Sequence, residues 1–161
     1  PLRFLSMGLP KNTHTQEGLA IMSELKSGCL TITRLKELAM RVLAVDMMTK
    51  GYDFKSTYHQ LKASNTLTDD KLYYLLARVY RGGGFTKDYL YLNGFRSVLR
   101  LEDSEVSISN LFLGKTSHAY LSLLNEFVDR GILEKPRYFC NSFSDPKPYD
   151  SILKYLTGNM K

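Results

Sequence analysis

Hydrophobic residues recur with the period of an α-helix along most of this chain. The clearest stretch covers residues 34–50, where one stripe carries Leu35, Leu38, Ala39, Val42, Leu43 and Met47. Thr33 stands before this stretch and Gly51 after it, and these residue types typically cap and end helices. The pattern therefore predicts a helix over residues 34–50. Asp46 lies on or near the stripe, so we expect it at the edge, paired with a nearby Lys or Arg.

The same periodicity predicts six further helices, over residues 16–26, 53–63, 69–80, 87–100, 116–130 and 149–156. Thr68 and Thr86 are placed to cap two of them, and Gly131 and Gly158 to end two others. The alternation typical of strands is almost absent, and a short stretch such as 106–108 cannot make a sheet alone. The predicted fold class is all-α, with about seven helices packed across short loops.

Length and composition indicate one folded domain over residues 1–161. Hydrophobic residues make up 43% and charged residues 24%, a balance typical of globular chains rather than disordered ones. No internal repeat or linker rich in Pro and Ser interrupts the sequence, although Pro136, Pro146 and Pro148 mark a looser region before the last helix. The eight Phe and eleven Tyr suit a packed helical core, or equally a surface that another part of a longer protein would cover.

Cysteine usage and hydropathy limit where the protein works. Cys29 and Cys140 form no CxxC or Cys/His cluster, which favours buried thiols in a reducing compartment such as the cytoplasm. One long-range disulfide is the alternative. Arg3 interrupts the first apolar run, and no run of 18 apolar residues exists, so we expect neither a secretory signal nor a membrane partner.

The net charge of +6 would suit an anionic partner, but the basic residues are scattered among acidic ones. Lys36 adjoins Glu37, and Lys87 adjoins Asp88. Such mixing is typical of a solvated surface, so the charge pattern does not favour a nucleic-acid partner.

The segment His14-Thr15-Gln16-Glu17-Gly18-Leu19-Ala20 places a carboxylate near a predicted helix start. Thr13 or Thr15 would cap this helix, and Glu17 in its first turn would meet a favourable helix dipole. From these residues alone, an ordinary helix start is the simpler interpretation. The chain contains no HExxH, GxSxG, P-loop or GxGxxG motif, and His14, His59 and His118 are isolated in sequence.

Several ordered blocks nevertheless resemble one protein family. They are Gly8-Leu9-Pro10, Thr15-Gln16-Glu17-Gly18-Leu19-Ala20, Arg81-Gly82, Phe85-Thr86-Lys87-Asp88, Tyr91-Leu92, Gly94 and Leu113-Gly114-Lys115. With these blocks the chain resembles the bacterial proteins named for a QEGLA motif, described as modulating flavohaemoglobin expression. It also resembles the related animal microtubule-associated tyrosine carboxypeptidases. The resemblance reaches to about Leu133 and implies the C-terminal part of a zincin-like metallopeptidase.

The resemblance also implies a zinc ligand. In that family a HExxxH helix supplies two histidine ligands and the general-base glutamate, and the Glu of the EGLA motif is the third ligand, which matches Glu17. A zinc ion with three protein ligands and a water activates that water and polarises the scissile carbonyl. HExxxH does not occur in these residues, so we expect the upstream part of the same polypeptide to supply it, and this chain alone to be inactive and to bind no zinc. His14 is an alternative extra ligand that the family does not use.

A carboxypeptidase must also bind the terminal carboxylate of its peptide or protein substrate, which Arg or Lys does best. The candidates that match the family blocks or stand beside them are Arg78, Arg81 and Lys87. Tyr91 stands one helical turn beyond Lys87 and could donate a hydrogen bond to the substrate. The alternative is that Lys87 and Asp88 are solvated and Tyr91 is a core residue.

Three functions therefore stay open. The first is a zinc-dependent carboxypeptidase-like hydrolase, to which this chain contributes Glu17 and part of the substrate wall. The second is a non-catalytic helical interaction or regulatory domain that has lost this chemistry. The third is nucleic-acid binding, which would show a strong dependence on salt.

Overall fold

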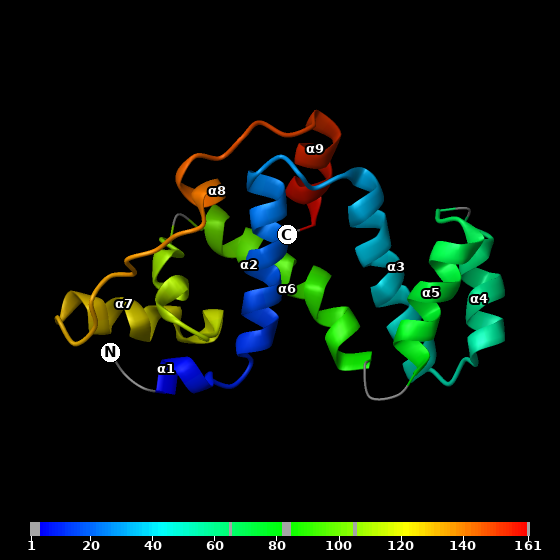
Figure 1. Cartoon of the computed structure of the whole chain (residues 1–161), viewed down its shortest axis with the longest axis horizontal. Coiled ribbons are helices and arrows are strands. Elements are labelled where there is room, and N and C mark those ends of the chain that lie inside the picture. The colour runs from blue at the N-terminus through cyan, green and yellow to red at the C-terminus, as the bar shows by residue number, and fades with distance from the viewer. Residues whose placement is uncertain (1–3, 65, 82–84, 105, 161) are drawn as a thin grey trace. The chain divides into compact units, whose positions relative to one another are not determined.

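The computed structural model describes residues 4–64, 66–81, 85–104 and 106–160, and the regular elements among them are helices, with no strand (Figure 1). This confirms the all-α fold class. Contacts between residues divide the chain into two compact units. Unit 1 comprises Pro1–Leu30 and Asn93–Lys161, and unit 2 comprises Thr31–Leu92. The single domain over residues 1–161 stays a prediction.

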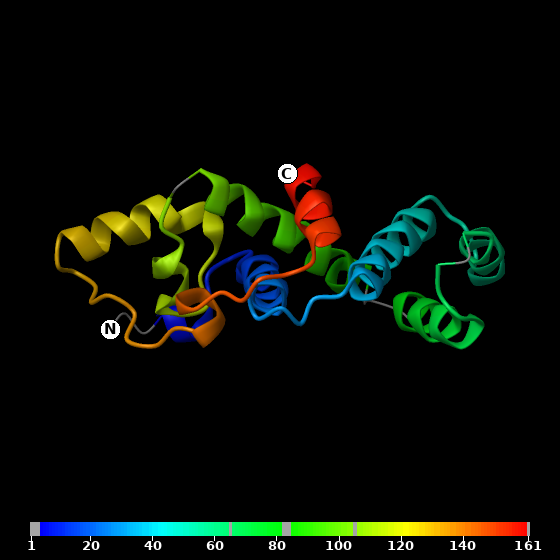
Figure 2. The same cartoon turned by 90° about the horizontal axis from the view of Figure 1, so that it is seen from above.

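Unit 2 contains three helices, α3 (Ile32–Thr49), α4 (Phe54–Lys62) and α5 (Asp69–Tyr80), together with the beginning of α6 (Phe85–Asp103). The helices α3, α4 and α5 pack pairwise against one another (Figures 1 and 2).

The rest of α6 belongs to unit 1. The other elements of this unit are, on average, shorter than the helices of unit 2. They are α1 (Phe4–Met7), α2 (Asn12–Lys26), η1 (Ser109–Leu113), η2 (His118–Tyr120), α7 (Leu121–Asp129), α8 (Asn141–Ser144) and α9 (Ser151–Asn159). The two η elements are 3₁₀ helices that lead into α7, and α8 packs beside α2 (Figure 1).

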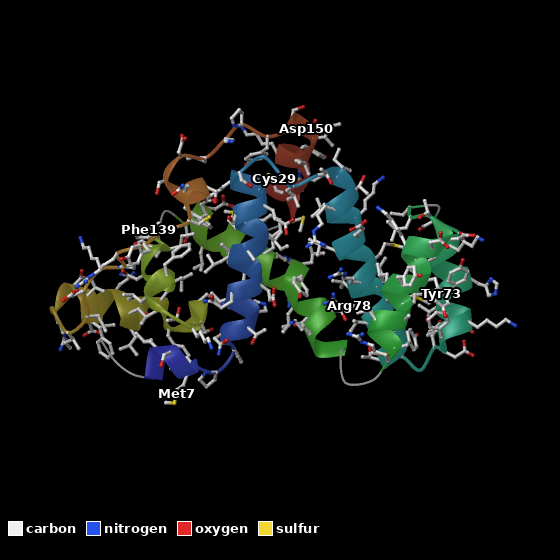
Figure 3. All side chains as sticks on the ribbon, viewed as in Figure 1. Met7, Cys29, Tyr73, Arg78, Phe139 and Asp150 are labelled. Atoms are coloured by element: carbon white, nitrogen blue, oxygen red, sulfur yellow. The ribbon has the colours of Figure 1, made fainter. Side chains whose placement is uncertain are left out.

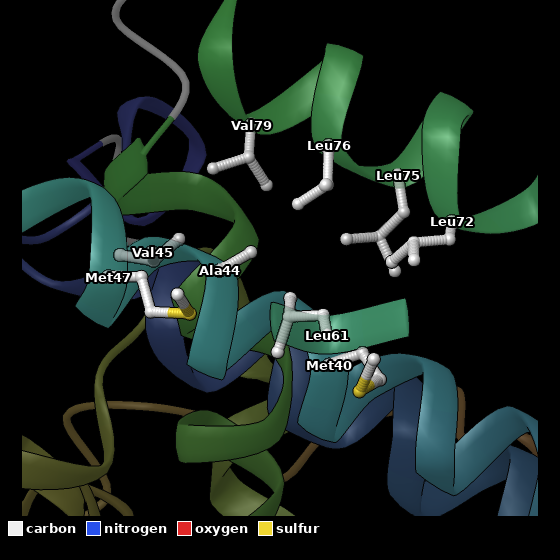
Figure 4. Packing of buried hydrophobic residues seen from close by; sticks show 9 residues of the cluster. All are labelled: Met40, Ala44, Val45, Met47, Leu61, Leu72, Leu75, Leu76 and Val79. Atoms are coloured by element: carbon white, nitrogen blue, oxygen red, sulfur yellow. The ribbon is translucent and has the colours of Figure 1, made fainter. Parts of the chain in front are cut away.

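The core of unit 2 is a cluster of aliphatic and methionine side chains from α3, α4 and α5 (Figure 4). Its members are Met40, Ala44, Val45, Met47, Leu61, Leu72, Leu75, Leu76 and Val79. The four from α5 recur at the spacing of one helical face. Burying each leucine contributes roughly 1.5–3 kcal/mol, so this face accounts for much of the stability of the unit.

The predicted helix over residues 34–50 is real, but its buried face differs from the predicted stripe. Leu43 is 48% exposed, whereas Met40, Ala44 and Val45 are buried. The helix packs against both α4 and α5, so its apolar surface is wider than one stripe. Thr31 rather than Thr33 caps it, through the Arg34 N–H. The pairing expected for Asp46 is confirmed, because Lys50 Nζ lies 2.6 Å from its carboxylate.

The start of α2 corrects the prediction for the segment around Glu17. The helix begins at Asn12, and its N-cap is Lys11, in the left-handed conformation with φ of 62°. Thr13 and Thr15 therefore lie inside the helix and do not cap it, and its first turn holds no acidic residue. Glu17 lies in the second turn, so its carboxylate does not mark the helix start.

The other helix boundaries lie closer to their predicted positions. The helix predicted over residues 69–80 is observed with the same bounds as α5. The last helix begins at Ser151, with Asp150 as its cap, and contains Gly158. The side chain of Thr86 lies outside the described residues, but α6 begins at Phe85, so Thr86 is not its cap. The segment predicted as one helix over residues 116–130 is split into η2 and α7.

The cysteine prediction was wrong about burial. Cys29 and Cys140 are both exposed, and they are not joined as a disulfide. The aromatic residues also contribute less to the core than expected. Phe95 is fully buried, but Tyr73, Tyr74 and Tyr138 are 53%, 73% and 87% exposed. Aliphatic side chains fill most of the interior instead. Within the described ranges, none of the helices has the length and hydropathy needed to cross a membrane.

Candidate functional site

Glu17 is half-buried on α2, and the helix around it is fixed by a close backbone approach in unit 1. A Cβ atom added to Gly18 would lie 2.3 Å from the Gly94 carbonyl oxygen, and one added to Gly94 would lie 2.1 Å from the His14 carbonyl oxygen. Only glycine at both positions lets α2 and α6 come so close. The residue next to Glu17 therefore sets the spacing between these helices.

A second contact holds α2 one turn earlier. Thr15 is fully buried, and its hydroxyl oxygen accepts a hydrogen bond of 2.9 Å from the His118 backbone N–H. The same oxygen lies 3.1 Å from His118 Nδ1. Because the oxygen already accepts from the amide, its own hydrogen is available to donate to an unprotonated Nδ1. This contact suits a neutral His118 ring that accepts the hydrogen bond at Nδ1.

His14 faces this ring from α2. The centroids of the His14 and His118 rings are 5.2 Å apart. Burial lowers the pKa of both histidines, the charge of His118 lowers the pKa of His14 further, and Lys11 adds to the effect on each. His14 Nδ1 is buried, with no hydrogen-bond partner among the described residues. Two neutral rings therefore pack beside the segment that carries Glu17.

These donors do not make a complete metal centre. Across the described ranges, no three His, Cys, Asp or Glu side chains are grouped closely enough to hold an ion. Glu17, the carboxylate that the resemblance matches to a zinc ligand, lies on a helix whose position is set by Gly18 and Thr15. The remaining ligands of a zinc site would come from other residues.

In unit 2 the charged residues gather around Asp88 at the beginning of α6. This carboxylate is 2% exposed, although the sequence indicated a solvated residue. Arg78 Nε on α5 lies 2.7 Å from Asp88 Oδ1, and Arg41 on α3 places a guanidinium nitrogen 3.8 Å from the same oxygen. Asp88 Oδ1 and Arg41 Nε both lack a well-directed hydrogen bond among the described residues. The cluster is therefore held mainly by charge.

Tyr91 completes this cluster one turn after Asp88. The guanidinium carbons of Arg41 and Arg78 lie 5.5 Å and 5.9 Å from the Tyr91 ring centroid, within the range of cation–π attraction. An Arg78 nitrogen also donates to the Tyr91 hydroxyl at 3.5 Å, a weak contact at this length. The structure thus brings together two of the predicted substrate residues, Arg78 and Tyr91 (Figure 3 labels Arg78).

The other two predicted substrate residues lie near the break between α5 and α6. Arg81 is the exposed C-cap of α5, and Lys87 is exposed in the first turn of α6. Gly82, from the block Arg81-Gly82, lies outside the described residues. Glu17 belongs to unit 1, whereas Arg78, Arg81, Lys87 and Tyr91 belong to unit 2.

Sequence reasoning missed Arg41 and the burial of Asp88. Arg41 follows Leu38 by three residues and precedes Val45 by four, and both of these are buried. An Arg between two buried positions on one helix face indicates a charged group that needs a buried partner. That signal was present, but its partner Asp88 is 47 residues away and could not be named.

The sequence model of the microtubule-associated tyrosine carboxypeptidase family matches residues 1–161. The chain belongs to this family. Comparison with curated proteins finds no match, and comparison with solved structures finds none either. Membership relates the chain to carboxypeptidases and agrees with the blocks around Glu17 and Lys87. Its relation to the QEGLA-motif proteins rests on the resemblance alone.

Proposed function

We propose that this chain forms part of a zinc-dependent carboxypeptidase-like hydrolase, which removes a C-terminal residue from peptides or proteins. The observation that carries the proposal is the match of the carboxypeptidase family over residues 1–161. Glu17 is one zinc ligand in this proposal. The two histidine ligands and the general base come from a HExxxH segment outside these residues, and the chain alone is inactive.

When bound, zinc would activate a water molecule and polarise the scissile carbonyl. The residues of this chain have two tasks beside that chemistry. Glu17 presents a carboxylate from a helix whose position is set by the backbone contact between Gly18 and Gly94. Such fixed support matters because a metal ligand must hold its geometry closely.

The second task is to hold the substrate. Arg78 carries a guanidinium that is paired with Asp88 and packed on Tyr91, so its position is set before substrate arrives. Arg81 and Lys87 add exposed positive charges near the ends of α5 and α6. We assign these three basic residues and Tyr91 to binding the substrate's C-terminal end.

The test is peptide trimming by a longer protein that contains these residues and a HExxxH segment. A panel of peptides that differ only in the C-terminal residue would define specificity, which the family name alone does not establish for this chain. Glu17→Gln should abolish trimming, whereas Glu24→Gln on the same helix, which is also half-buried, should preserve it. Trimming that survives Glu17→Gln would contradict the role of Glu17. No trimming by the unaltered protein would favour a non-catalytic interaction domain.

A further inference from the structure

A pocket of about 300 Å³ opens on unit 2 beside the cluster around Asp88. Three basic side chains line it, from Arg41, Lys71 and Arg78, against one acidic side chain, Glu37. Leu67, Tyr74 and Leu75 supply an apolar part of the wall. A pocket of this size and mixed lining suits a small anionic group attached to an apolar one.

Asp88 contacts two of these basic residues but does not line the pocket. It therefore anchors Arg41 and Arg78, while both residues remain part of the pocket wall. Their side chains are 17% and 38% exposed. Arginines held in this way lose little conformational freedom when a ligand arrives.

The charges in and behind the pocket do not balance. Lys71 Nζ lies 3.2 Å from Glu37 Oε1, so these two groups offset each other. Asp88 is then shared between Arg41 and Arg78, which leaves one positive charge in excess among the described residues of this region. Burial lowers the pKa of Arg41, and the neighbouring charge of Arg78 lowers it further. The Arg41 guanidinium would therefore gain from one additional negative charge nearby.

We propose that this pocket binds a single carboxylate group, with Arg41 and Arg78 as the residues that recognise it. A carboxylate is planar and carries one charge, so it matches both the guanidinium geometry and the single excess charge. This inference deepens the proposed peptidase function on which it rests, because it adds Arg41 and Lys71 to the residues that would receive a substrate terminus. The apolar wall then contacts the C-terminal side chain.

Binding to the full 161-residue chain tests this without catalysis. The probes are N-acetylated Gly-Gly-Phe with a free C-terminus, its C-terminal amide, and an amidated acetyl-Gly-Glu-Gly, compared by calorimetry at one salt concentration. We expect the free acid to bind at least about tenfold more tightly than its amide, because charge-assisted hydrogen bonds are lost with the charge. Tight binding of the amidated Glu peptide would support carboxylate recognition and assign it to acidic side chains. Equal binding of the free acid and its amide would overturn the proposal.

Variants of the pocket residues test whether the carboxylate binds in this pocket. Arg41→Gln should weaken binding of the free acid about tenfold. Arg41→Lys should weaken it by less, because lysine keeps the positive charge and loses only the paired N–H donors of the guanidinium. Lys71→Gln removes an exposed charge that folding does not need, and should weaken binding about twofold to threefold. Lys55→Gln, an exposed charge on α4 that does not line the pocket, is the matched control.

Unchanged binding in both Arg41→Gln and Lys71→Gln would overturn the proposal. An equal loss in Lys55→Gln would do the same, because it would indicate attraction to net charge alone. The pocket and the peptidase proposal fail separately. Carboxylate binding that depends on Arg41, in a protein that trims no peptide, would support the pocket proposal and contradict the peptidase proposal. Peptide trimming by a protein whose carboxylate binding does not depend on Arg41 would support the peptidase proposal and contradict the pocket proposal.

Discussion

The surroundings of Glu17 and those of Asp88 are held in place by different forces. In unit 1, α2 and α6 meet backbone to backbone at Gly18 and Gly94, where no side chain fits. In unit 2, α3, α5 and α6 are joined through one buried carboxylate and two guanidinium groups. The first arrangement depends on shape and the second on charge. The two regions should therefore respond differently to the same kind of substitution.

The largest effect should come from filling the space between α2 and α6. We expect Gly94→Ala to lower the free energy of unfolding by about 3 kcal/mol, because the new Cβ meets backbone that cannot easily move. Gly158→Ala is the control, since a Cβ there has nothing within 4 Å. In the last turn of α9, one residue before the helix ends, it should change the free energy of unfolding by less than about 0.5 kcal/mol. Urea unfolding measures both, and a loss of the same size in the two variants would contradict the account.

Removing the buried charge in unit 2 should have the next largest effect. Asp88→Asn keeps the shape of the side chain but leaves Arg41 and Arg78 to repel each other. We expect the free energy of unfolding to fall by about 2 kcal/mol. This is less than is usual for a broken buried ion pair, because Arg78 is partly exposed. Asp46→Asn removes an exposed partner of Lys50 and should cause no measurable change. If chemical unfolding ranks the two variants equally, charge does not hold this cluster.

A smaller effect should follow loss of the hydrogen bond between Thr15 and His118. Thr15→Val keeps the shape but leaves the His118 N–H without its acceptor, so we expect a loss of about 1–2 kcal/mol. Thr13→Val on the exposed side of α2 should stay within about 0.5 kcal/mol of the parent chain. Equal unfolding free energies for the two variants would show that this contact does not support α2.

The smallest effect should be a dependence of stability on pH in unit 1. Burial lowers the pKa of His14 and His118 in the folded chain, so the unfolded chain takes up these protons first as pH falls. Stability should be lost as pH falls through the unfolded pKa of about 6.5 toward the lowered folded values. His14→Gln combined with His118→Gln should reduce the loss between about pH 7.5 and about pH 5.5. An unchanged loss in the double variant would contradict this origin.

Much of the fold could be predicted, because local pattern decides it. Residues 69–80 carry apolar residues at helical spacing, and α5 has those bounds. Thr68 stands at the N-cap position as expected, although its side chain makes no capping hydrogen bond. The start of α2 could not be predicted, because its cap, Lys11, is not a typical capping residue. Thr15 looked like a capping residue but is buried by a contact with His118, 103 positions away.

The candidate site shows the same division. Arg78 and Tyr91 were both expected in the substrate wall, and they lie together because α5 and α6 follow each other closely in sequence. Arg41 was missed because it lies far from Asp88 in sequence and contacts it only in the folded chain. Asp88 looked solvated beside Lys87, but the two guanidinium groups allow its burial. Sequence patterns identify the residue types of such a cluster better than their partners.

Zinc binding by Glu17 can be measured directly. The direct measurement is zinc content per chain in a longer protein that contains these residues and a HExxxH segment, for the parent, Glu17→Gln and Glu24→Gln. Metal emission spectroscopy after dialysis would give the ratio. We expect about one zinc per chain in the parent and in Glu24→Gln, and a large loss in Glu17→Gln. Full zinc content in Glu17→Gln would contradict it.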